Sequence, residues 1–257
     1  MAILEARDIR RTYGSVVALD GADFDVEAGQ VTALIGDNGA GKSTLIKILS
    51  GAEQADSGSI VVEGKEIRVE SPSAARAMGI ETVYQDLALC PHLDPVKNLY
   101  LGREVRAGGL AGALGFLNRK AMREGSIDAF VDLGATVRTL SEPVGTMSGG
   151  QKQSVAVARA AAWASKIIFL DEPTAALGVV QTANVLDLIR RIRDKGIGVV
   201  LISHSMPEVL EVADTIQVLR RGVRVATYQA SQTSIDELVG TMTGTLDTVN
   251  NGRVATA

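Results

Sequence analysis

The apolar and polar positions of this chain group into short strand-like runs, some of them separated by helical periods. Residues 3–36 predict strands, with a turn at 27–30 before the apolar run V-T-A-L-I. Glycines then interrupt the pattern, and K-S-T-L-I-K-I-L predicts the start of a helix. S-I-V-V-E-G-K-E-I-R-V-E (59–70) predicts a hairpin, and I-E-T-V-Y-Q-D (80–86) predicts a short strand ending in a polar loop.

The pattern of apolar and polar positions changes in the middle of the chain. Residues 91–160 are mostly helical in pattern, with a glycine-rich gap at 107–115 that predicts a flexible loop. We therefore expect a smaller helical lobe inserted into a larger α/β unit.

The last third returns to short apolar runs separated by an amphipathic helix. I-I-F-L-D (167–171) and G-V-V-L-I-S (198–203) predict buried strands, and 178–195 predicts the helix between them. Buried runs of this kind are typical of a parallel sheet covered by helices on both faces. Residues 241–257 show no period, so we expect a frayed tail there.

Composition excludes several classes of protein. The chain has 257 residues, 46% of them hydrophobic, and a net charge of −4, which lacks the basic footprint of a general nucleic-acid binder. Cys90 is the one cysteine, so no internal disulfide forms, and we expect it to be a small buried apolar residue. The N-terminus does not resemble a signal peptide, and no apolar run approaches the ~18–20 residues that span a bilayer. If the protein works at a membrane, we expect a partner to hold it there.

The clearest chemical motif is G-D-N-G-A-G-K-S-T (36–44), placed between an apolar strand and a helix. Its glycines allow backbone N–H groups to surround phosphate oxygens, and Lys42 supplies a positive charge. Ser43 is expected to bind Mg²⁺ through its hydroxyl, and Thr44 to reach the α-phosphate. The alternative, an ordinary glycine-rich turn, does not explain the whole motif.

Two later strands end in polar residues that suit nucleotide hydrolysis. Asp171 ends one strand and is expected to hold Mg²⁺, while Glu172 points elsewhere and polarises the attacking water. His204 ends the next strand, where ligands bind in open α/β sheets. The alternatives are an acid pair that caps a turn and a histidine that caps the following helix. His92 receives no role.

A second anion site is predicted at T-M-S-G-G-Q-K-Q (146–153), where two glycines open a helix. Two phosphate sites do not fit easily on one nucleotide within one chain. We therefore predict a head-to-tail dimer, in which Ser148, Gly149 and Gly150 of one copy close over the γ-phosphate held by the other. ATP binding would hold the two copies together, and hydrolysis would release them.

The motifs occur in a specific order: G-D-N-G-A-G-K-S-T, Y-Q-D, M-S-G-G-Q, I-I-F-L-D-E-P-T and I-S-H. Over residues 3–240 the chain resembles the nucleotide-binding subunit of ATP-binding-cassette transporters. The resemblance implies an α/β P-loop fold with a mostly parallel core and an N-terminal antiparallel β subdomain. The resemblance implies a single domain over residues 1–240, followed by a tail at 241–257. Within this domain, the parallel core and the β subdomain would occupy about 1–90 and 161–240, and a helical lobe would occupy about 91–160.

The resemblance also implies a set of ligands for ATP and Mg²⁺. Tyr13 would stack on adenine, unless it fills the core, and Gln151 would approach the ribose. Gln85 would bind Mg²⁺ and sense the membrane partner, unless it is only a loop amide. The implied nucleotide-binding residues are Tyr13, Gly36, Asn38, Gly39, Ala40, Gly41, Lys42, Ser43, Thr44, Ser148, Gly149, Gly150 and Gln151. The implied catalytic residues are Glu172, His204 and Gln85, and the implied metal ligands are Ser43, Gln85 and Asp171.

Two positions depart from the family pattern. Met147 replaces the usual leucine, a swap that conserves volume. Gly178 replaces an aspartate that makes contacts across the dimer, which puts in doubt how tightly two ATP sites communicate. The surrounding residues D-E-P-T-A-A-L-G-V and N-L-Y-L-G-R-E are similar to the monosaccharide-importer branch, in its single-cassette, fructose-type form.

The function implied is ATP hydrolysis that drives monosaccharide uptake. The implied partners are an integral-membrane permease, on which the helical lobe docks, a second cassette, and indirectly a periplasmic or extracellular sugar-binding protein. The implied location is the cytoplasmic face of the inner (plasma) membrane. Alternatives are the ATPase of a different importer, a soluble cassette ATPase acting on nucleic acid or ribosomes, and a P-loop kinase. The short insert and negative charge disfavour the soluble cassette, and a kinase leaves S-G-G-Q unexplained.

Overall fold

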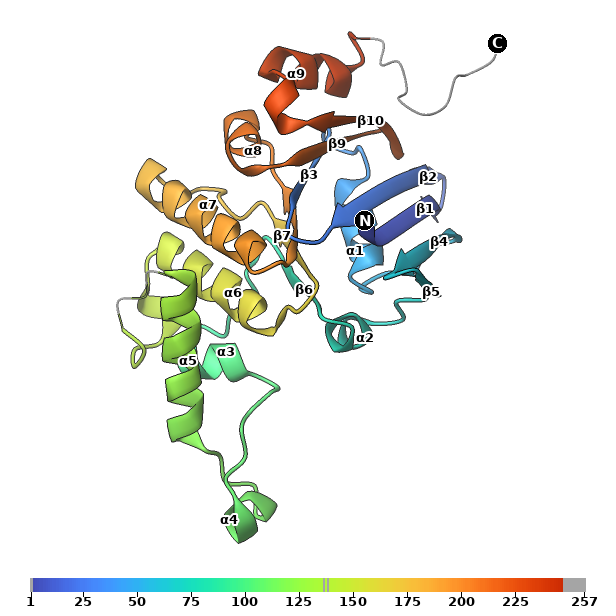
Figure 1. Cartoon of the computed structure of the whole chain (residues 1–257). Helices are drawn as coiled ribbons and strands as arrows, with labels where there is room; N and C mark the ends of the chain where they lie inside the picture. The colour runs from blue at the N-terminus through green and yellow to red at the C-terminus, as the bar shows by residue number, and fades with distance from the viewer. Residues whose placement is uncertain (1, 136, 138, 247–257) are drawn as a thin grey trace.

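A computed structural model describes residues 2–135, 137 and 139–246. The first part of the chain forms an antiparallel sheet with strand order β2-β1-β4-β5 (Figure 1). Its strands are β1 (Ala2–Tyr13), β2 (Val16–Glu27), β4 (Ser57–Val62) and β5 (Lys65–Ile67).

The second sheet is the centre of the molecule, with strand order β10-β9-β3-β8-β7-β6. All neighbours from β9 to β6 run parallel, and β10 is antiparallel at the edge. Its strands are β3 (Val31–Ile35), β6 (Ile80–Val83), β7 (Ile167–Asp171), β8 (Gly198–Ile202), β9 (Thr215–Arg220) and β10 (Val223–Gln229). The expectation of an α/β fold with a mostly parallel core and an antiparallel β layer is confirmed.

The central strands β7 and β8 are mostly apolar on both faces, because both faces of the sheet are covered. In β7, Ile168 and Leu170 join a core formed with the helices, whereas Ile167 and Phe169 join the core shared with the antiparallel sheet. This division follows from strand geometry, in which successive side chains point to opposite faces.

Helices cover the two faces unequally. Helix α1 (Lys42–Leu49) packs in the core between the two sheets, and α6 and α7 pack on the opposite face of the central sheet (Figure 1). Helices α8 and α9 pack with β3 and β9 in a third apolar core. The helices after α1 cover these cores or extend from them. They are α2 (Pro72–Ala77), α3 (Pro95–Tyr100), α4 (Gly109–Ala113), α5 (Arg119–Leu133), α6 (Gly149–Trp163), α7 (Val179–Asp194), α8 (Met206–Val212) and α9 (Ile235–Thr243), with 3₁₀ turns at Val144–Thr146 and Ala230–Gln232. Within the described residues, no helix has the length and apolar character needed to cross a membrane.

Two local expectations are wrong. The interval 107–115 is not a simple loop, since α4 forms inside it between residues that pair as a short hairpin. The tail does not begin at 241, because Thr241 is buried and its hydroxyl hydrogen-bonds to Tyr228, which keeps α9 helical to Thr243. Residues 247–257 of the predicted tail lie outside the described residues. The boundaries of the helical lobe stay a prediction.

Candidate functional site

The loop 36–41 joins the carboxyl end of β3 to α1, as the phosphate-binding motif predicts. Gly41 has φ +103°, and a Cβ there would lie 2.6 Å from the carbonyl oxygen of Ala18, so only glycine fits. Asn38 and Gly39 are exposed on the loop, with no neighbouring atom near a Cβ built on Gly39, and Ala40 is buried beneath them. The loop is therefore anchored on its inner side and open on its outer side.

Lys42 is the first residue of α1 and is almost fully buried. Its Nζ donates to the carbonyl oxygens of Gly36 at 2.7 Å and Asp37 at 3.1 Å, which holds the ammonium inside the loop. Burial lowers the pKa of Lys42, while the charges of Glu172, Asp37 and Asp171 oppose that shift. Ser43 and Thr44 follow on the first turn, with Ser43 exposed.

Three further residues come together at the carboxyl ends of neighbouring parallel strands. Glu172 follows β7 and His204 follows β8, and the Oε1 of Glu172 lies 3.1 Å from the Nε2 of His204. Gln85 follows β6, and its Nε2 lies 3.5 Å from the Oε2 of Glu172. The sheet order β8-β7-β6 places these loops side by side, which the sequence order cannot show.

Glu172 sits in an unusual backbone conformation. Its φ is +49°, and its N–H donates to the carbonyl oxygen of Ile202 at 2.9 Å. A bulky residue in the left-handed region stores local strain, which the neighbouring strand offsets here through that hydrogen bond. The turn directs Glu172 to His204, whereas Ser205 occupies the N-cap of α8, so the alternative of a capping histidine is wrong.

Asp171 is the last residue of β7 and lies in the electrostatic field of the same cluster. Burial raises its pKa, and the charge of Glu172 raises it further, while Lys42 and His204 oppose the shift. Two adjacent carboxylates, whose charges act on one buried ammonium, would gain from an added cation. A carboxylate, a serine hydroxyl at residue 43 and the amide oxygen of Gln85 are all oxygen donors, which Mg²⁺ prefers.

Tyr13 ends β1 and is 41% exposed, so the alternative that it fills the core is wrong. Its hydroxyl donates to the carboxylate of Glu53, and the Arg11 guanidinium lies 4.9 Å from the ring centroid. The pKa of Glu53 is lowered first by this hydrogen bond and then by Lys47 and Arg11. An aromatic ring held in this way at the protein surface suits stacking on a base.

Ser148 is the N-cap of α6 and forms a reciprocal capping box with Gln151. The Gln151 N–H donates to the Ser148 Oγ at 3.3 Å, and the Ser148 N–H donates to the Gln151 Oε1 at 3.1 Å. The Ser148 hydroxyl keeps its proton for another acceptor. The structure shows Gln151 as part of this cap, and its contact with ribose stays a prediction.

The two predicted phosphate sites lie on opposite sides of the central sheet within one chain. Helix α1, which carries the first, packs with the antiparallel sheet, and α6, which carries the second, packs with α7 and the other face. Gly149 and Gly150 open α6, and a Cβ on Gly150 would lie 2.6 Å from the Cγ of Gln181 in α7. Met147 is buried in the same core, in keeping with a swap of equal volume.

Sequence reasoning missed Arg159, which connects α6 to the loop after β6. Its Nη1 donates to the carbonyl oxygen of Ala88 at 2.7 Å, and its Nη2 donates to that of Leu87 at 3.0 Å. Both acceptor residues have positive φ, at +44° and +59°. A lone arginine inside V-A-V-A-R-A-A-A-W was the available signal, because a charge among apolar helix positions needs a partner.

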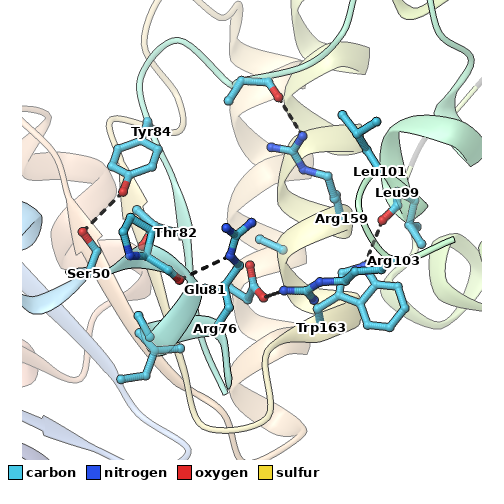
Figure 2. A pocket seen from close by; sticks show the side chains of 15 residues that line it. Ser50, Arg76, Glu81, Thr82, Tyr84, Leu99, Leu101, Arg103, Arg159 and Trp163 are labelled. Atoms are coloured by element: carbon cyan, nitrogen blue, oxygen red, sulfur yellow. Dashed lines mark hydrogen bonds and ion pairs between the residues drawn. The ribbon is translucent and has the colours of Figure 1, made fainter. Parts of the chain in front are cut away.

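A groove of about 330 Å³ lies between α6 and the segment from α2 to α3 (Figure 2). Figure 2 shows Arg103 in ion-pair contact with Glu81, and the distance between Nη2 and Oε1 is 2.5 Å. Trp163 donates from its Nε1 to the carbonyl oxygen of Leu99 at 2.9 Å, and the Arg103 guanidinium lies over its ring. The groove wall therefore combines aromatic and charged side chains.

Comparison with known proteins places this site in a family. A profile described as "ABC transporter" matches residues 19–175, from the antiparallel sheet to beyond the Asp171–Glu172 pair. The chain belongs to the ABC transporter family. This family binds nucleotide through the cassette that the profile covers, so nucleotide binding is an attribute of the chain.

Several curated relatives match this ABC transporter chain over nearly its whole length. It is 49% identical to the fructose import ATP-binding protein FrcA of Rhizobium meliloti, covering 94% of both chains. It is 45% identical to the xylose/arabinose import ATP-binding protein XylG of Sulfolobus acidocaldarius, covering 97% of this chain and 98% of that one. A ribose import ATP-binding protein, RbsA 2 of Burkholderia pseudomallei, is 43% identical, and the match covers 46% of that longer protein.

Solved structures confirm the predicted cassette fold. An ATP-binding cassette of an ABC transporter in its ADP conformation superposes with a TM-score of 0.75 at 27% identity, covering 95% of both chains. A nucleotide-free cassette superposes with a TM-score of 0.73 at 28% identity.

Proposed function

We propose that the chain is the ATP-hydrolysing subunit of an importer that moves a monosaccharide through a membrane permease. The observation that carries the assignment of ATP hydrolysis is the convergence of Gln85, Glu172 and His204 at the ends of three neighbouring parallel strands. The buried Lys42 and the terminal Asp171 share the electrostatic field of this cluster. A phosphate-binding loop beside an acid and a histidine is the arrangement that phosphoryl transfer to water requires.

We assign each residue a role in ATP hydrolysis from its position in the site. Lys42 neutralises phosphate oxygens, and the amides of the 36–41 loop bind them. Glu172 accepts a proton from the attacking water, and its contact with His204 holds its carboxylate in one orientation. Ser43, Gln85 and Asp171 would hold Mg²⁺, which would supply positive charge against the phosphate oxygens.

A second copy of the chain would complete the site. The free proton of the Ser148 hydroxyl and the open N-terminus of α6 suit a γ-phosphate, and they lie on the opposite side of the central sheet from the loop of the same chain. A head-to-tail dimer would bring Ser148 of one copy to the loop of the other, forming two equivalent sites.

The groove of Figure 2 is the surface we assign to a helix from the permease. It combines the exposed Leu101, the aromatic Trp163 and the Arg103–Glu81 pair, a mixture that fits an amphipathic helix. Arg159, which lines the groove, also holds the loop that follows Gln85. A partner in the groove would therefore act on the hydrolytic site through one side chain.

The sugar class rests on the relatives. FrcA, XylG and RbsA 2 are named for the import of fructose, xylose or arabinose, and ribose, all monosaccharides. We therefore assign a pentose or hexose as cargo and the cytoplasmic face of the plasma membrane as the place of action, with a sugar-binding protein delivering cargo to the permease. A soluble cassette acting on nucleic acid is not favoured, since the relatives are import subunits.

The Glu172→Gln variant tests this assignment. With ATP present it is expected to bind nucleotide, to form a stable dimer in size-exclusion chromatography, and to hydrolyse ATP at least ~100-fold more slowly, which is the range for loss of a general base. Tagged variant extracted with detergent from membranes of its own cell should retain a polytopic permease. Near-normal hydrolysis would remove Glu172 from its role, and recovery of only soluble protein or RNA would refute the transport assignment.

A mixing experiment tests the composite site. Lys42→Ala is expected to lose ATP binding, and Ser148→Arg is expected to bind ATP but not to hydrolyse it. An equal mixture should recover part of the activity, because heterodimers contain one site built from an intact loop and an intact α6 end. If the mixture stays as inactive as its components, the two halves do not come from different copies.

A further inference from the structure

The helical part of the chain ends in a projecting hairpin, residues 105–118, which we call the tip hairpin. Figure 1 shows α4 within it, beyond the end of α5 and far from both sheets. Its base is closed by the Ala107 N–H, which donates to the Phe116 carbonyl at 2.8 Å, and by the Asn118 N–H, which donates to the Val105 carbonyl at 2.7 Å. A Cβ on Gly112 would lie 1.8 Å from the Ala107 carbonyl oxygen, so the tip folds tightly only with glycine there.

The tip hairpin exposes large apolar side chains to solvent. Leu110 is 85% exposed, Leu114 is 76% exposed and Phe116 is 63% exposed. Scattered apolar residues are normal on a surface, but three within seven residues of one small protrusion form a patch that gains from leaving water.

The charge around this patch is one-sided. Residues 105–123 contain four basic residues and no aspartate or glutamate, in a chain whose net charge is −4. The four are exposed: Arg106, Arg119, Lys120 and Arg123. Glu104 and Glu124 lie just outside the segment, and Lys120 approaches Glu124 at 3.9 Å. Positive charge is thus concentrated where the apolar tip projects.

We propose that the tip hairpin contacts the anionic lipid surface of the membrane directly. Leucine and phenylalanine side chains enter the boundary between headgroups and acyl chains, and flanking cations pair with anionic headgroups. A protruding tip suits a fluid lipid surface, since its apolar side chains enter the bilayer without a preformed pocket. This contact rests on the proposed function only in that the permease brings a membrane within reach.

The first test uses the purified protein alone, without permease. Wild-type protein is mixed with vesicles of phosphatidylglycerol and phosphatidylethanolamine, and with vesicles of phosphatidylcholine, and floated on a density gradient. The expected result is flotation with the anionic vesicles, weakened by high salt, and little flotation with phosphatidylcholine. Because ATP hydrolysis is measured separately in the same samples, failure of the lipid contact is distinguishable from failure of the ATPase assignment.

Two variants separate the parts of the contact. Arg119→Gln with Arg123→Gln is expected to weaken binding about 25-fold, since each cation near an anionic surface contributes a factor of about five. Leu110→Ser with Phe116→Ser is expected to abolish flotation. Val131→Ser is the matched control, because Val131 is an exposed apolar residue of α5 outside the tip hairpin, and it should bind like wild type.

The outcomes decide the proposal. All variants should hydrolyse ATP at the wild-type rate, since the tip hairpin lies away from the site, and Phe116→Ser alone serves if the double variant is unstable. No flotation of wild type with anionic vesicles overturns the proposal, as does equal flotation of wild type and the tip variants. The proposal is also overturned, in favour of a protein partner, if the tip variants no longer co-purify with the permease and the wild type does not bind vesicles.

Discussion

Replacing Arg159 with methionine removes a side chain that joins α6 to the loop after Gln85 by hydrogen bonds to Leu87 and Ala88. Arg159→Met keeps the apolar stem and deletes both donors. The loop then loses the contacts that hold two residues of positive φ, and Gln85 lies two positions before the first of them. We expect a loss of both stability and turnover.

The magnitude follows from the contacts. Hydrogen bonds from a charged donor contribute about 1.5–3 kcal/mol each, so two of them set a gross loss of about 3–6 kcal/mol. Two effects reduce this gross loss. Ala88 is exposed, so its carbonyl oxygen can accept a hydrogen bond from water instead. Burial lowers the pKa of Arg159, which means that the buried charge itself is unfavourable. We expect a net loss of about 1–3 kcal/mol in the free energy of unfolding.

Turnover should fall for a separate reason. A displacement of about 1 Å in a positioned group costs up to ~100-fold in rate, and Gln85 contacts Glu172 only at 3.5 Å. We expect kcat to fall at least about tenfold while the KM for ATP changes less than about twofold, because the Lys42 loop lies on β3 and α1. The kcat of Arg159→Lys should lie between those of the wild type and Arg159→Met, since an ammonium can hydrogen-bond well to one of the two carbonyls.

The assay combines urea unfolding, ATPase kinetics and amide hydrogen exchange over residues 85–89. Arg123→Met serves as the control, because Arg123 is an exposed arginine of α5. Faster exchange of the loop together with a lower kcat supports the reasoning. A stability loss with unchanged kcat and unchanged loop exchange would refute it, since Arg159 would then serve only the packing of α6.

Two further predictions concern other parts of the chain. The hydrogen bond from Tyr13 lowers the pKa of Glu53 from 4.5, so the stabilisation is full above that unfolded value and is lost as pH falls through the lower folded pKa. Tyr13→Phe should therefore flatten the fall of the unfolding free energy as pH is lowered below the unfolded value, and an unchanged slope contradicts this. Gly178 is the N-cap of α7 without a side-chain cap, so Gly178→Asp should raise the unfolding free energy by about 0.3–1 kcal/mol in urea titrations, and a destabilised variant would show that the contact of its Cβ with Gln181 dominates.

Local pattern was sufficient for the elements of the sheets. β7 and β8 are continuous apolar runs, because both faces of the central sheet are covered. Such runs predict buried strands directly from the sequence. The motif at 36–44 predicted the strand–loop–helix unit for a similar reason, since Gly41 accepts a backbone conformation that other residues avoid.

The wrong expectations have a common cause in long-range contacts. Composition alone indicated a loop at 107–115, but the pairing of Arg106 with Leu117 brings the ends together and lets α4 form. Periodicity indicated a tail from 241, but Thr241 is tied to Tyr228 on a neighbouring strand. Neither contact leaves a trace in local sequence, because the partners are more than ten residues apart.

The identity of the chemical groups was therefore readable from the sequence, since a phosphate loop, an acid and a histidine are recognised by residue type and by the strand ends that carry them. Their mutual placement was not. Glu172 contacts His204 and Gln85 because the central sheet orders its strands β8-β7-β6. Arg159 hydrogen-bonds to the loop after Gln85 because α6 packs against these strands. Strand order is set by the packing of the whole core, and no single segment of the chain contains that information.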